Sequence, residues 1–155
     1  MNREGHAGFS LILMSIFLYL MNLWNREWLI ILALAIGFSM LPDLDIRFEI
    51  PHRKYTHTVV FAFVSGFAIG FIFDYSGMNF WTGFTGAFAG SLMHIAGDLL
   101  THMPFAPLSP FVTKKMALGL FRADNTVVNR IILIFGVFVF SILYPGSPIK
   151  IDTFL

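Results

Sequence analysis

Apolar residues occur along the chain in five long segments separated by shorter polar stretches. The segments run from Gly8 to Trp24, from Trp28 to Leu41, from Thr58 to Phe73, from Phe80 to Leu100 and from Val127 to Tyr144. They are near the length of about 20 residues that crosses a bilayer as a helix, although the second is short. Irregular backbone is not tolerated against lipid, so the pattern predicts an all-α polytopic membrane bundle of about five transmembrane helices.

Composition agrees with a membrane protein of one domain. Of the 155 residues, 57% are hydrophobic and 12% are charged, and the mean hydropathy is +0.76. This length suits a single domain over residues 1–155. A formal net charge of +1 argues against a nucleic-acid-binding surface. The chain has no cysteine, so nitrogen and oxygen ligands must hold any bound metal.

Cations are divided unequally between the two ends of the predicted helices. By the positive-inside rule the richer side is cytoplasmic, which places the C-terminus outside and the protein in the cell or inner membrane. The richer side has Arg3, Arg47, Arg53, Lys54, Lys114, Lys115, Arg122 and Arg130, and the other has Arg26 and Lys150.

The longest connection between predicted helices runs from Met103 to Thr126. It opens with a stretch containing three prolines, which excludes a regular helix there. Ser109 followed by Pro110 is typical of a cap and a first helical position, so we expect a short surface helix from Phe111 to Phe121. The apolar content of this connection favours an ordered lid.

A stretch with the sequence S-L-M-H-I-A-G-D-L-L-T-H, residues 91–102, places metal-binding side chains four residues apart in an apolar run. Steps of four advance about 40° around a helix, so His94, Asp98 and His102 form one polar ridge. Such side chains are rare in apolar helices unless they pair, reach the interface or hold an ion. Glycines mark where helices approach closely. Gly83 and Gly90 share the face of the ridge, whereas the GxxxG at residues 66–70 favours a contact with another helix or a second protomer.

Further polar side chains stand at the same end of the predicted bundle. At about 1.5 Å per residue, they fall in one layer with the ridge. Groups from several helices are a known way to build a metal site in a bundle core. A helix stop with turn-forming aspartates would also explain L-P-D-L-D at residues 41–45. The predicted metal ligands are His6, Asp43, Asp45, His57, His94 and Asp98.

This ligand set suits zinc, with manganese or iron as alternatives. Six candidates are more than one tetrahedral ion needs, so we expect two ions that share a bridging carboxylate from Asp98 or Asp45. Thr56 suits a helix cap better than chemistry. His102 is a candidate for a contact with the substrate or with a ligand.

Four motifs, in order along the chain, resemble the pattern of the YdjM-like membrane-bound metal-dependent hydrolases. They are E-G-H at 4–6, L-P-D-L-D at 41–45, H-R-x-x-T-H at 52–57 and H-x-x-x-D-x-L-T at 94–101. The resemblance implies a small helical inner-membrane protein with a divalent metal site and hydrolase activity. It also makes His52 and Arg53 candidate site residues. A more distant similarity is to zinc-dependent phospholipase C and related nucleases, which share the spacing of histidine and aspartate.

The leading hypothesis is hydrolysis of a phosphoester in a lipid or lipid-linked substrate that reaches the site from the cytoplasmic leaflet. The candidates to move the proton are Asp43, Asp45 and His52. The cations expected to offset charge on the phosphate are Arg53, Lys54, Arg122 and Arg130.

The rival hypothesis is a metal transporter or a non-catalytic, metal-dependent membrane scaffold. Transport needs a polar route to the far side of the membrane. The outer halves of the five predicted helices offer mainly Ser15, Tyr19, Asn22 and Thr82.

Overall fold

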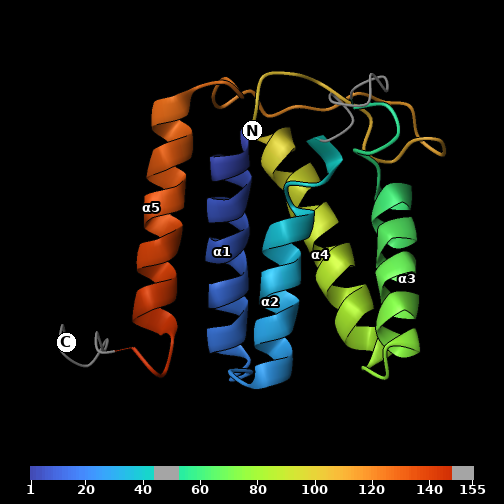
Figure 1. The fold of residues 1–155 in the computed structure, drawn as a ribbon. Coiled ribbons are helices and arrows are strands. Elements are labelled where there is room, and N and C mark those ends of the chain that lie inside the picture. The colour runs from blue at the N-terminus through green and yellow to red at the C-terminus, as the bar shows by residue number, and fades with distance from the viewer. Residues whose placement is uncertain (44–52, 148–155) are drawn as a thin grey trace.

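The computed structural model describes residues 1–43 and 53–147, and these contain five α-helices and no strand (Figure 1). The predicted all-α class is confirmed, and four of the helices begin close to the expected positions. The first helix begins several residues before the expected Gly8, which brings His6 into its first turn. The helices are α1 (Arg3–Leu20), α2 (Arg26–Phe38), α3 (Val59–Tyr75), α4 (Phe80–Leu99) and α5 (Thr126–Leu143).

Every helix begins after a residue whose side-chain oxygen accepts a hydrogen bond from a backbone N–H of the first turn. This oxygen satisfies one of the donors that the start of a helix leaves without a partner. Thr58 caps α3, so the expectation that Thr56 is the cap was wrong, and the Thr56 hydroxyl contacts His57 instead. The five caps are Asn2, Asn25, Thr58, Asn79 and Asn125.

The bundle is held together by close pairs of helices, α3 with α4, α1 with α5 and α2 with α4 (Figure 1). Glycines allow these approaches, as the sequence predicted for α4. A Cβ atom on Gly90 would lie 2.4 Å from the carbonyl oxygen of Ala35 in α2, and one on Gly83 would lie 2.7 Å from that of Ile69 in α3. The apolar core between α1 and α2 includes Leu18.

The connection from α4 to α5 forms no helix, so the surface helix expected from Phe111 to Phe121 was wrong. The chain instead runs back across the end of α4. The N–H groups of Leu118 and Leu120 donate to the carbonyl oxygens of Leu99 and Leu100 over 2.7 and 2.8 Å. The last carbonyls of a helix have no partner within it, and these bonds supply partners for the end of α4. The N–H groups that donate them are then not available to form a helix in the connection.

Among the described residues, α5 is the helix that is both long and apolar enough to cross a membrane, with 18 residues from Thr126 to Leu143. The helix α3 is apolar but shorter. One span therefore follows from length and composition, and membrane crossing by the other four helices stays a prediction.

Candidate metal centre

Histidine and aspartate side chains from four segments meet at the end of the bundle where the long connections lie. His6 stands in the first turn of α1, Asp43 follows α2, and His57 precedes the cap of α3. His94 and Asp98 are one turn apart near the end of α4. All except Asp43 are completely buried, so these groups share a pocket shielded from solvent.

Asp98 is in contact with the three imidazoles of the cluster. Its Oδ1 atom lies 3.4 Å from Nε2 of His6. Its Oδ2 atom lies 3.4 Å from Nε2 of His57 and 3.8 Å from Nε2 of His94. The three rings therefore turn the same type of nitrogen toward one carboxylate.

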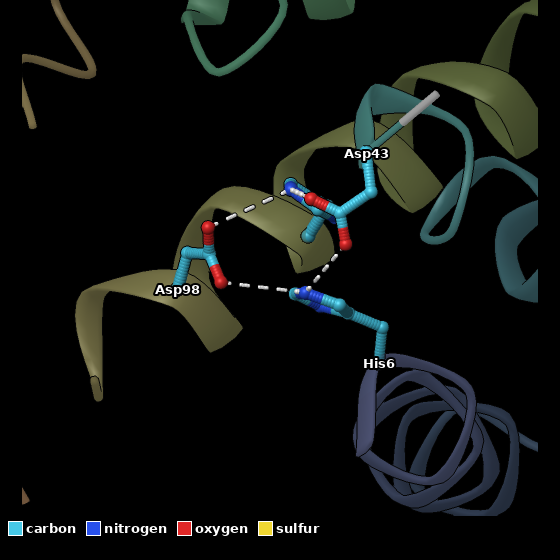
Figure 2. Close-up of side chains that lie close together, drawn as sticks. His6, Asp43 and Asp98 are labelled. Carbon is cyan, nitrogen blue, oxygen red and sulfur yellow. Dashed lines mark ion pairs between the residues drawn. The ribbon is translucent and has the colours of Figure 1, made fainter. Parts of the chain in front are cut away.

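Asp43 closes the cluster on another side and points toward His6 and Asp98 (Figure 2). Its oxygens lie 3.5 Å from Nε2 of His57, 3.7 Å from that of His94 and 3.8 Å from that of His6. Ligand bonds of about 2.0–2.1 Å place neighbouring ligand atoms of tetrahedral zinc about 3.3 Å apart. The atoms of the cluster are therefore near ligand spacing.

Four of these residues could hold one metal ion, because their ligand atoms all lie within 4.8 Å of one another. The four are His6, Asp43, His94 and Asp98. His57 contacts both carboxylates beside them. The sequence had predicted all five as ligands, and the structure brings all five together.

Buried nitrogen atoms test whether a cation fits this site. Nε2 of His6 and Nε2 of His94 have no hydrogen-bond partner among the described residues. Leaving such an atom buried without a partner costs about 1–3 kcal/mol. A divalent ion between these nitrogens and the carboxylates would satisfy both kinds of group, so the residues fit a metal. Zinc as the metal and two as the number of ions stay predictions.

Outer contacts hold two of the rings in place. Nδ1 of His94 lies 2.7 Å from the carbonyl oxygen of Ser39. A carbonyl only accepts, so Nδ1 carries the proton and Nε2 presents its lone pair to the cluster. Nδ1 of His57 lies 2.9 Å from Oγ1 of Thr56. Such contacts orient an imidazole for metal binding.

His57 and Asp43, the two cluster residues outside the helices, shift the pKa of one another. Burial by itself lowers the pKa of His57, but Asp43 and Asp98 outweigh it and hold the pKa above its usual value. Burial raises the pKa of Asp43, but His57 and the other imidazoles outweigh it and hold the pKa below its usual value. The two carboxylates therefore favour positive charge on the imidazole of His57.

Arg53 lies against the cluster in an uncommon backbone conformation. Its φ of 63° is in the left-handed region, which residues other than glycine rarely adopt. Its Nη2 atom lies 2.9 Å from Oδ2 of Asp98, and Nη1 donates to the carbonyl oxygen of Met103 over 2.8 Å. Strained backbone held by such contacts is typical of functional sites.

The remaining candidates are of two kinds, those outside the described residues and those on the surface. Asp45 and His52 fall within residues 44–52, outside the described residues. His102 is exposed. Arg122 and Arg130 are also exposed, and they form ion pairs of 3.0 Å with Asp124 and of 3.5 Å with Glu4. Their proposed contacts with substrate stay predictions.

Several groups at the cluster were not predicted from the sequence. The amino group of Met1 contacts Oδ1 of Asp98, and the carbonyl oxygen of Ser39 contacts His94. Phe105 is buried with its ring centre 5.9 Å from that of His57. Phe105 stands between two prolines, and this position could have indicated it in the sequence. Backbone groups cannot be recognised from a sequence in this way.

The fold and the cluster together define an all-helical protein with one helix that could cross a membrane and a buried histidine and aspartate site that could hold a metal ion. The family model for the YdjM inner membrane protein matches residues 1–152, so the chain belongs to this family. No match was found among curated proteins or solved structures. The more distant similarity to zinc-dependent phospholipase C therefore stays a prediction.

Proposed function

We propose that this chain is a membrane-bound metal-dependent hydrolase that acts as a phosphoesterase on a lipid or lipid-linked substrate. The observation that carries the proposal is the meeting of three imidazoles and two carboxylates from four segments, with a guanidinium beside them. A metal bound for stability alone would not need the neighbouring cation. A phosphoester substrate would, because its negative charge must be offset.

The chain supplies groups for each requirement of such a hydrolysis. When bound, a divalent ion polarises phosphoryl oxygens and increases the acidity of water. The side chain of Asp43 is 15% exposed while that of Asp98 is fully buried, so Asp43 is the carboxylate better placed to take a proton from water. Arg53, which contacts Asp98 and the carbonyl oxygen of Met103, would offset the charge of a phosphate.

The test combines metal analysis with an activity panel on the detergent-purified protein. We expect bound divalent metal and cleavage of phosphate monoesters or diesters, compared with phosphonate and acyl esters. The variants His94→Ala and Asp98→Ala should lose both the metal and the activity, since each removes a ligand. Exposed His102 offers a matched control, and His102→Ala should keep its metal.

Two results would contradict the proposal. Metal that survives both His94→Ala and Asp98→Ala would place the ion elsewhere. Stoichiometric metal without cleavage of any ester in the panel would favour the rival interpretation, a metal transporter or a non-catalytic scaffold.

A further inference from the structure

A cationic cavity of about 420 Å³ opens beside the metal centre. Its lining includes Arg53, Lys54 and Lys115, and no acidic side chain is among the described residues that line it. Lys54 and Lys115 are exposed, so their charges are available to a ligand. Two exposed lysines beside a guanidinium that Asp98 already pairs favour an anionic group, and phosphate is well suited to such a set.

This cationic cavity adjoins the cluster, because two of the residues that line it also contact members of the cluster. Arg53 lines the cavity and contacts Asp98, and Phe105 lines the cavity and packs on the ring of His57. An anion held by the lysines would therefore lie next to the metal ligands.

An apolar groove of about 380 Å³ begins where the cationic cavity ends. Lys54 and Ser109 line both, and the remaining lining of the groove includes Val60, Phe61 and Val64 of α3. The groove continues onto a flank of α3 on which Val64 is 60% exposed, followed by the exposed Phe67 and Phe71. Residues spaced in this way share one face of a helix, and in a membrane such a face meets acyl chains.

We propose that the cationic cavity and the apolar groove together bind one anionic phospholipid, with its phosphate at Lys54 and Lys115 and an acyl chain along Val60 and Val64. This assignment rests on the proposed function, since it names the substrate class of the same site. The cationic cavity and the apolar groove adjoin each other, so a ligand that covers both has an anionic group and an apolar chain. A soluble phosphate ester would leave the groove uncovered, and a zwitterionic lipid would add its own cation to the three already present.

The test measures binding of a phosphonate analogue of phosphatidic acid to the detergent-purified full chain. A phosphorus–carbon bond prevents hydrolysis, so binding is observed without turnover. The comparison ligands are a phosphocholine lipid with the same chains and a glycerol phosphonate without chains. We expect the anionic lipid to bind at least about tenfold more tightly than either.

Matched variants locate the two parts of the site. Lys115→Glu should raise the Kd for the anionic lipid about tenfold, whereas Lys114→Glu, which changes the neighbouring exposed lysine outside the cavity, should not. Val64→Trp should fill the groove and raise the Kd about fivefold, whereas Val137→Trp on the exposed face of α5 should not.

The outcomes separate this inference from the proposed function. Equal Kd values for Lys115→Glu and Lys114→Glu, equal binding of the phosphocholine lipid, or tight binding of the chainless phosphonate that Val64→Trp leaves unchanged would each overturn the lipid site. If esters are cleaved while these variants bind normally, the phosphoesterase stands and the lipid site falls. If the lipid binds as expected and no ester is cleaved, the binding site stands and the phosphoesterase falls.

Discussion

The hydroxyl of Thr56 holds the ring of His57 through a contact of 2.9 Å between Oγ1 and Nδ1. His57 is a predicted metal ligand, and losing the outer partner of a metal-binding imidazole costs roughly 10–100-fold in metal affinity. We therefore expect Thr56→Val to weaken metal binding about tenfold, as measured by competition with a chelator. Thr56→Ser keeps the hydroxyl and should bind nearly as the unchanged protein does. Equal affinities of the two variants would show that the hydroxyl does not orient the ring.

Two of the candidate ligands could be predicted individually because each is costly in its surroundings. His94 and Asp98 stand in an apolar helix, where an unpaired imidazole or carboxylate is disfavoured, so their presence already required an explanation. The carbonyl oxygens of Ser39 and Met103 could not be predicted in this way. Every residue has a carbonyl, and only the tertiary structure determines which one meets a side chain.

The packing of α1 on α5 depends on two glycines that face each other. A Cβ atom on Gly8 would lie 2.5 Å from Cα of Leu133, and one on Gly136 would lie 2.6 Å from the carbonyl oxygen of Gly8. Gly8→Ala must therefore push the helices apart, and we expect it to lower the free energy of unfolding by about 1–3 kcal/mol. Thermal unfolding in detergent measures the change as a lower Tm.

Gly37 provides the control for this prediction. It lies within α2, and a Cβ atom there would have no neighbour within 4 Å. Alanine favours a helix interior by about 1 kcal/mol relative to glycine, so Gly37→Ala should leave the Tm unchanged or raise it. A Tm for Gly8→Ala equal to that of Gly37→Ala would show that α1 and α5 are not closely packed in the membrane protein.

The helices were predictable because each coincides with a run of apolar residues. The connection from α4 to α5 was not predictable from its own residues. Ser109 and Pro110 suited a helix locally, but the carbonyls at the end of α4 took the hydrogen bonds that such a helix would have used. Long-range competition of this kind leaves no local pattern.

The bundle has one cationic end, and the candidate metal centre is at that end. The starts of α1 and α5, the approach to α3 and the connection after α4 all lie there (Figure 1). The opposite end, where α2 begins and α3 turns into α4, has Arg26 as its single lysine or arginine among the described residues. Assignment of the cationic end to the cytoplasm would make the site accessible to cytoplasmic water and to lipids of the inner leaflet.

Cysteine labelling tests this orientation directly, because the chain has no cysteine and each introduced one gives the whole signal. Lys115→Cys marks the cationic end, and Met78→Cys marks the turn between α3 and α4 at the opposite end. Both positions are exposed. If the cationic end of the bundle is in the cytoplasm, a membrane-impermeant maleimide added to spheroplasts should label Met78→Cys at once and Lys115→Cys only after permeabilisation.

The reverse order of labelling would place the candidate metal centre on the outer side of the membrane. Labelling of both before permeabilisation would mean that α3 and α4 do not carry the chain across the membrane, since the two positions then share one compartment.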